Sequence, residues 1–137
     1  MITTRRVSVA LAVTAVVNVV GGGASLLSPS LHARLLLPDG VVLDGLTLRY
    51  HIMVWCFVVA MGAGYAVAAR DPARQTALLL CAGFGKLAAA LVWVEMWMSG
   101  LGSPLMLGGI AFDAPLGVLF LAYAWPRLTD ASDPGPS

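Results

Sequence analysis

Residues 81–98 read CAGFGKLAAALVWVEMWM, and this stretch decides the fold class. It is apolar enough to lie in lipid, yet it carries Lys86 and Glu95. A charged side chain at bilayer depth costs about 2.5–3.5 kcal/mol on insertion scales, so such charges usually pair or face the interior of a helix bundle. The stretch therefore predicts a transmembrane helix whose two charges need partners elsewhere in the chain.

The rest of the chain has the same apolar character. Of its 137 residues, 59% are hydrophobic and 11% are charged, whereas about 25% are charged in a typical soluble domain. Four apolar runs are each roughly 20 residues long, the length that crosses a bilayer. They cover about residues 7–27, 48–69, 72–98 and 104–125. We predict an all-α membrane protein, an antiparallel four-transmembrane-helix bundle in a single domain (1–127), followed by a disordered cytoplasmic tail (128–137).

Composition and motifs argue against several other classes of protein. The net charge is +1 and no run of five like charges occurs, so no nucleic-acid partner is predicted. Cys56 and Cys81 fall in different spans without a CxxC pair, which argues against a redox relay. His32 and His51 form no HxxxH or HExxH pattern, so no metal site is predicted. Haem ligation by these two histidines stays open as an alternative that the spacing does not favour, and the cofactor is unknown.

The arginines predict the orientation. Five fall on the side of the termini and two on the other side, namely Arg5, Arg6, Arg70, Arg74 and Arg127 against Arg34 and Arg49. The positive-inside rule then places both termini in the cytoplasm. The first apolar run could instead be a secretory signal. It is long for one and no clear A-x-A site follows it, so we expect an uncleaved first span.

Two connections carry local signals. Ser28-Pro29-Ser30 and Pro38-Asp39-Gly40 bracket residues 31–37, which predicts a short interfacial helix that is either a lid or a plain connector. Asp71-Pro72 fits the N-cap and first position of the third span. A tight turn there predicts that the second and third spans are antiparallel neighbours.

Three polar residues are expected near the membrane midplane. Asn18, Lys86 and Asp113 are each about eight to eleven residues into their spans, on stripes of small residues that favour close helix packing. Glu95 follows Lys86 by nine residues, about 180° around the helix, so these two charges cannot pair. We predict a buried layer of Asn18, Lys86 and Asp113 with a Lys86–Asp113 ion pair.

This layer is the candidate ligand-binding site, with Trp93 on the Lys86 face as a further wall. The competing interpretation is that the pair only sets helix register. A second polar cluster of Arg49, His51 and Glu95 is predicted near the outer surface. The candidate catalytic residues are Asp113, Glu95 and His51, since a histidine beside a carboxylate can act as an acid–base pair. Interfacial charge pairing is the plainer alternative.

Several short motifs together suggest a family. They are Tyr50…Gly62-x-Gly64-Tyr65…Ala69-Arg70-Asp71-Pro72, then Gly83-x-Gly85-Lys86, and Asp113…Leu119-Phe120. This pattern resembles small bacterial four-helix integral membrane proteins of the DoxX-like group. The resemblance implies a multi-pass bundle in the bacterial cytoplasmic (inner) membrane and, for some members, quinone-linked redox chemistry. It brings no catalytic motif.

These observations leave three function hypotheses. The first is a small protein of the lipid bilayer that binds an apolar or quinone-like molecule, or that serves as a membrane subunit of a larger assembly. The second is an intramembrane enzyme of the isomerase or cyclase type acting on a lipophilic substrate, with Asp113 or Glu95 as proton donor. The third is a proton or ion pathway in a homo-oligomer, because four short helices enclose little space.

Overall fold

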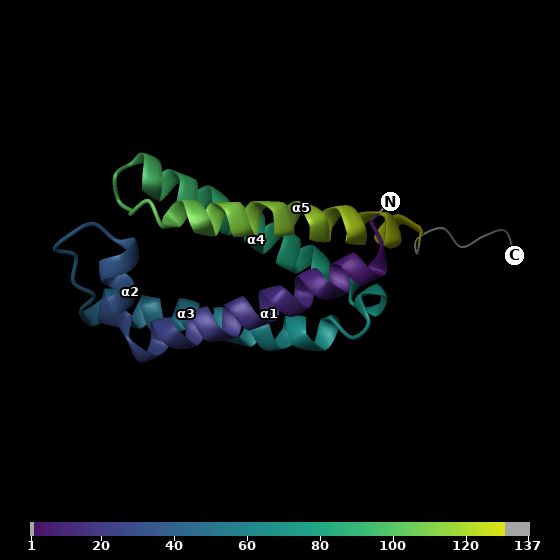
Figure 1. Ribbon diagram of the computed structural model, residues 1–137, viewed down its shortest axis with the longest axis horizontal. Coiled ribbons are helices and arrows are strands. Elements are labelled where there is room, and N and C mark those ends of the chain that lie inside the picture. The colour runs from purple at the N-terminus through teal and green to yellow at the C-terminus, as the bar shows by residue number, and fades with distance from the viewer. Residues whose placement is uncertain (1, 131–137) are drawn as a thin grey trace, which may run out of the picture.

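The computed structural model describes residues 2–130, and every regular element in this range is helical (Figure 1). Four long helices are present: α1 (Thr4–Leu27), α3 (Gly45–Ala68), α4 (Thr76–Met98) and α5 (Met106–Asp130). Two short elements join them, α2 (Pro29–Leu36) and the 3-10 helix η1 (Pro72–Arg74). The predicted all-α fold with four membrane-spanning helices is confirmed.

The long helices have the length and surface of membrane spans. They contain 23 to 25 residues each, or about 35 Å at 1.5 Å per residue, which exceeds the roughly 30 Å hydrocarbon core. Large apolar side chains also cover their outer faces; Phe57 and Leu91, for example, are 66% and 70% exposed. Helices that are apolar on the outside as well as the inside are suited to lipid rather than water, so this is a multi-pass membrane protein.

The four spans form two helix pairs. α1 packs along α3 (the first pair), and α4 packs along α5 (the second pair), as Figure 1 shows. Glycines allow the close approach. A Cβ built at Gly62 would lie 3.2 Å from the carbonyl oxygen of Ala15, and one built at Gly117 would lie 3.0 Å from that of Gly83. Because membrane helices associate through such small-residue contacts, each pair is tightly joined.

The two pairs share a core at one end only. This is the end where α1 begins and α5 ends, here called the termini end (Figure 1). The shared core consists of buried side chains from all four spans: Val7, Leu11, Ala15, Tyr65, Ala68, Leu79, Ala82, Phe120, Tyr123 and Ala124. The hydroxyls of Thr4 and Tyr123 lie 3.1 Å apart across it. The pairs therefore meet near the termini and separate toward the other end.

At that other end, here called the α2 end, a short contact links the two pairs. Ser103, in the turn between α4 and α5, donates its backbone N–H to the carbonyl oxygen of Leu36 at 2.8 Å. Its hydroxyl donates to the carbonyl oxygen of Leu35 at 2.6 Å. Both acceptors belong to the last turn of α2, whose final carbonyls have no partner within the helix. The helix α2 agrees with the interfacial helix predicted for residues 31–37.

Two local predictions are wrong. Pro72 begins the 3-10 helix η1 rather than the third span, and α4 starts at Thr76 because Gln75, with φ −114° and ψ 33°, interrupts the helix. The second and third spans are also not packed side by side: α3 pairs with α1, and α4 pairs with α5. At the C-terminal end α5 continues to Asp130, so residues 128–130 are helical, and the rest of the predicted tail lies outside the described residues.

Candidate functional site

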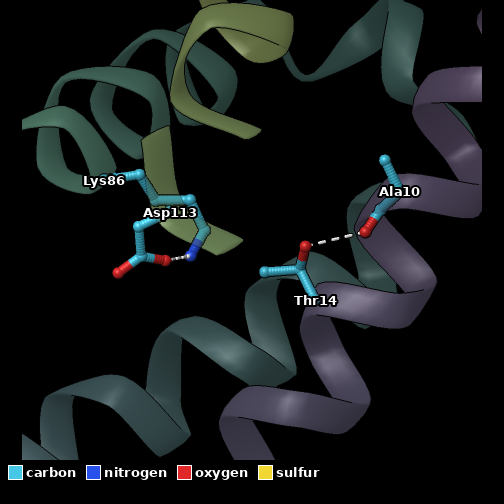
Figure 2. Close-up of polar contacts among 4 residues, drawn as sticks. All are labelled: Ala10, Thr14, Lys86 and Asp113. Carbon is cyan, nitrogen blue, oxygen red and sulfur yellow. Dashed lines mark hydrogen bonds and ion pairs between the residues drawn. The ribbon is translucent and has the colours of Figure 1, made fainter. Parts of the chain in front are cut away.

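Lys86 and Asp113 form an ion pair between the two helices of the second pair (Figure 2). Lys86 lies halfway along α4, and its Nζ donates a hydrogen bond to Oδ1 of Asp113 on α5. The two side chains are only 8% and 16% exposed. Within residues 2–130 the other ion pair, Arg74–Asp71, has exposures of 85% and 50%. The predicted Lys86–Asp113 ion pair is therefore confirmed, and it is the buried one.

A glycine contact places this ion pair. Gly83 is three residues before Lys86, and Gly117 is four residues after Asp113, so both lie about one turn toward the termini. A Cβ built at either glycine would lie within 3.1 Å of the carbonyl oxygen of the other glycine. The backbones are thus close enough for the two charged side chains to meet. The ring of Phe112 lies 4.9 Å from Lys86 Nζ, a cation–π contact worth about 0.5–2 kcal/mol.

The ion pair lies at the boundary of the shared core. Ala82, one turn before Lys86 on α4, is 2% exposed and belongs to that core. Leu116, three residues after Asp113 on α5, packs against it. Beyond this level the two helix pairs separate (Figure 1). The charges therefore occupy the position where the shared packing between the pairs ends.

Two polar residues of α1, Thr14 and Asn18, make no hydrogen bond to the ion pair within the described residues. The buried Thr14 hydroxyl donates to the carbonyl oxygen of Ala10 in its own helix at 2.7 Å (Figure 2). Asn18 is part of the contact with α3, because a Cβ built at Gly62 would lie 3.0 Å from the Cβ of Asn18. In the described chain, Asn18 makes no hydrogen bond with Lys86 or Asp113. The polar layer thus consists of the ion pair without a bonded asparagine.

Trp93 lies on the same face of α4, seven residues beyond Lys86. Its indole packs over Gly109 of α5, where an added Cβ would meet ring atoms at 3.4–3.5 Å. Seven residues correspond to about two helical turns. Trp93 therefore covers the α4–α5 contact on the α2 side of the ion pair.

The predicted outer cluster of Arg49, His51 and Glu95 is wrong. Glu95 is exposed, and its Oε1 accepts a hydrogen bond from the Ser99 hydroxyl at 3.0 Å. Arg49 is exposed and has no ion-pair partner among residues 2–130. The physical reason is the helix pairing: α3 packs with α1 and α4 packs with α5, and the core shared by α3 and α4 lies at the termini end, away from Arg49, His51 and Glu95. The enzymatic hypothesis then depends on Asp113.

His51 instead belongs to a cluster of three rings at the α2 end, formed with His32 and Trp55 and here called the histidine cluster. The ring centroids of His32 and His51 are 4.9 Å apart, and those of His32 and Trp55 are 4.7 Å apart. Nε2 of His51 donates to the carbonyl oxygen of Ser25 at 3.1 Å. The cluster thus joins α1, α2 and α3.

The imidazole of His32 is unusual. Both of its ring nitrogens are buried and have no hydrogen-bond partner among residues 2–130. Each unsatisfied buried polar group costs about 1–3 kcal/mol. Burial, together with the neighbouring His51, lowers the pKa of His32 from 6.5 to about 4, so the ring is neutral at pH 7.

Sequence reasoning missed this cluster, because His32 and His51 lie far apart in the sequence and in different helices. The usable signal was the Ser28-Pro29 stop, which folds α2 back beside the start of α3. Groups of three or more His, Cys, Asp or Glu side chains arranged to hold a metal are absent from the part of the chain that the structure describes.

Comparison with known proteins adds no family assignment. No protein-family model matches the chain, and no curated protein or solved structure matches it.

Proposed function

We propose that this protein binds an apolar molecule with a polar head group, such as a quinone, beside the Lys86–Asp113 ion pair. The observation that carries the proposal is a nearly buried ion pair at the level where the two helix pairs separate. The ion pair would orient the head group, and the apolar part of the ligand would lie among the lipid-facing side chains of the spans.

Unused hydrogen-bonding capacity at the ion pair supports this. An ammonium group has three donors, and a carboxylate accepts on both oxygens. In the described residues, Lys86 Nζ and Asp113 use one hydrogen bond between them. Oδ2 of Asp113 and the other ammonium hydrogens are thus free to bond a carbonyl or hydroxyl group. Such hydrogen bonds to charged groups are worth about 1.5–3 kcal/mol each.

The energetics also favour a role beyond packing. Burying two charges costs several kcal/mol per ion, and apolar side chains of similar volume often pack equally well or better. Ionisable side chains within membrane spans therefore frequently mark a ligand or ion pathway. Aromatic side chains are close by, with Phe112 at 4.9 Å from Lys86 Nζ and Trp93 further along the same face of α4. A planar head group could stack against them.

The route of entry would be lateral. Hollows in the surface lie at the start of α1, lined by Thr3, Arg5, Arg6 and Val9, and beside α2. Neither includes Lys86 or Asp113. We propose that a ligand reaches the ion pair from the bilayer, because the outer faces of the spans carry large exposed apolar side chains.

We place the protein in the bacterial cytoplasmic membrane with both termini in the cytoplasm. Five arginines gather at the termini end: Arg5 and Arg6 lie in the first turn of α1, Arg70 and Arg74 lie just before and within η1, and Arg127 lies in the last turn of α5. This distribution supports the orientation through the positive-inside rule. The bacterial membrane and the quinone-like ligand class are part of this proposal and rest on the sequence resemblance to the DoxX-like group alone, since no family model matches the chain. We also propose that the protein forms a homo-oligomer or joins a larger membrane complex.

The test is quenching of tryptophan fluorescence by a short-chain ubiquinone analogue in protein reconstituted into lipid nanodiscs. The double variant Lys86→Met, Asp113→Leu should stay folded, because both charges are removed together. It should bind at least about tenfold more weakly, from the loss of one charge-assisted hydrogen bond. Glu95→Gln, at an exposed position of the same helix, is the matched control. Unchanged affinity in the folded double variant would refute the proposal.

A further inference from the structure

We propose that His32 and His51 together bind a late first-row divalent metal ion, Cu²⁺ most tightly. This site lies at the α2 end, where α1, α2 and α3 meet, and it is separate from the Lys86–Asp113 ion pair. Three features of the histidine cluster support it: the orientation of His51, the unpartnered nitrogens of His32, and the distance between the two rings.

One ring nitrogen of His51 is held by a backbone carbonyl, as in many histidine metal ligands. Its Nε2 bonds to the carbonyl oxygen of Ser25 at 3.1 Å, and a carbonyl oxygen can only accept. The proton is therefore on Nε2, which leaves the lone pair on Nδ1 in the neutral ring. Histidine ligands in metalloproteins commonly donate their second ring nitrogen to a backbone carbonyl in this way, which sets the tautomer and the ring orientation.

His32 supplies the second lone pair. A neutral imidazole has one N–H and one acceptor nitrogen, and neither nitrogen of His32 has a partner among residues 2–130. Buried polar groups of this kind call for a specific partner such as water or an ion. The ring of Trp55 lies 4.7 Å from that of His32 and covers one side of the cluster.

The distance between the rings fits adjacent positions on one metal ion. With metal–nitrogen bonds of about 2.0–2.1 Å, the centroid of each imidazole lies about 3.2 Å from the metal. Two such rings are about 4.5 Å apart at a 90° ligand angle and about 5.2 Å apart at the tetrahedral angle. The observed separation of 4.9 Å lies between these values, with the ring planes at 61°.

The same distance excludes the opposed arrangement. Two imidazoles on opposite sides of one ion, as in bis-histidine haem, need centroids about 6.4 Å apart by the same bond length. The 4.9 Å separation is too short for a haem between the rings. The haem alternative for these two histidines is therefore incompatible with the described geometry.

The ligand set also indicates the type of metal. No third His, Cys, Asp or Glu side chain joins the two histidines within the described chain, so the remaining positions would be filled by water. This differs from structural zinc sites, which take four protein ligands. Imidazole suits copper, nickel and zinc, and the affinity of a given site for divalent ions is highest for Cu²⁺.

The test uses detergent-purified protein carrying a histidine-free affinity tag and stripped with a chelator. Cu²⁺ is titrated at pH 7, and binding is followed by tryptophan quenching and by electron paramagnetic resonance. We expect one ion per chain, with couplings from two imidazole nitrogens. His32→Leu and His51→Leu should each weaken binding by at least about tenfold, the scale on which perturbed metal sites lose affinity. Arg34→Gln, an exposed position on α2, should bind like wild type.

The electron paramagnetic resonance spectrum of the wild-type protein counts the coordinating imidazole nitrogens, so it tests the proposal even where a histidine variant fails to fold. A signal with one nitrogen or none overturns the proposal, as does wild-type affinity in folded His32→Leu. Binding that appears only at millimolar Cu²⁺, or that is equal in all variants, reveals an adventitious ion only and also overturns it.

Discussion

A double-mutant cycle on Lys86 and Asp113 should give a coupling free energy of about 2 kcal/mol. Charges in contact attract by about 4 kcal/mol at an effective dielectric constant of 20, and desolvation offsets part of this gain because the side chains are only 8% and 16% exposed. Neutral hydrogen bonds between membrane helices average about 0.6 kcal/mol, and a charged pair should exceed that value. The variants are Lys86→Met, Asp113→Asn and the double substitution.

The measurement is the free energy of unfolding in mixed micelles, followed by helical circular dichroism as denaturing detergent is added. Arg74→Met with Asp71→Asn forms the matched control cycle, because this ion pair is 85% and 50% exposed. Exposed ion pairs contribute about 0–1 kcal/mol, so the control coupling should be no more than about 0.5 kcal/mol. The difference between the two cycles isolates the effect of burial.

Additive single substitutions at Lys86 and Asp113, with a coupling free energy no larger than that of the exposed control pair, would refute the reasoning. That result would mean that the two charges do not meet in the folded protein. Coupling of the expected size with unchanged quinone binding would instead assign the ion pair a purely structural role, so the stability and binding measurements separate the two interpretations.

Three further predictions concern other parts of the fold. Gly117→Ala should lower the free energy of unfolding by about 1–3 kcal/mol, because the added Cβ would lie 2.8 Å from Leu87 Cγ and 3.0 Å from a carbonyl oxygen. Gly85→Ala is the control and should not destabilise the protein, because the space around Gly85 is open. Equal changes in the melting temperature of the two variants would contradict the α4–α5 packing. In metal-free protein, docking of α2 should weaken as the pH falls from 6.5 toward 4, because the pKa of His32 is about 4 in the folded protein against 6.5 in the unfolded chain, so the undocked ring binds the extra proton. The stabilisation is fully present above pH 6.5, and about 1–2 kcal/mol of it should be lost after allowance for solvent screening. Hydrogen exchange of the α2 amides that is no more pH-dependent in wild type than in His32→Leu would contradict this prediction. Glu95→Gln should leave stability within about 0.5 kcal/mol of wild type, because Glu95 is exposed and its carboxylate, among residues 2–130, accepts a hydrogen bond from Ser99 alone. A large loss on detergent denaturation would show a partner that the described fold does not provide.

The membrane-span prediction succeeded because it rests on local chemistry. A run of about 20 apolar residues is sufficient to specify a bilayer-crossing helix, since the backbone must satisfy its own hydrogen bonds in lipid. The Lys86–Asp113 ion pair was also predictable. Both residues lie at mid-depth in consecutive antiparallel spans, and a buried charge needs a partner.

The helix pairing was not predictable in the same way. All four spans carry small residues, so several pairings satisfy the same pattern. Only the structure shows that Gly62 fits against α1 and that Gly83 fits against Gly117. This choice separated Glu95 from Arg49 and His51 and removed the predicted outer cluster.

The amino-acid sequence is therefore sufficient to identify the segments long and apolar enough to cross a membrane, the position of each charge along its span, and the need of Lys86 for a partner such as Asp113. The tertiary structure alone decided that the spans form two pairs sharing a core at the termini end, with the ion pair at its boundary. It also brought His32 and His51 together from two separate helices. The physical reason is that hydropathy and helical period act within one helix, whereas lateral contacts depend on how the shapes of two helix surfaces fit.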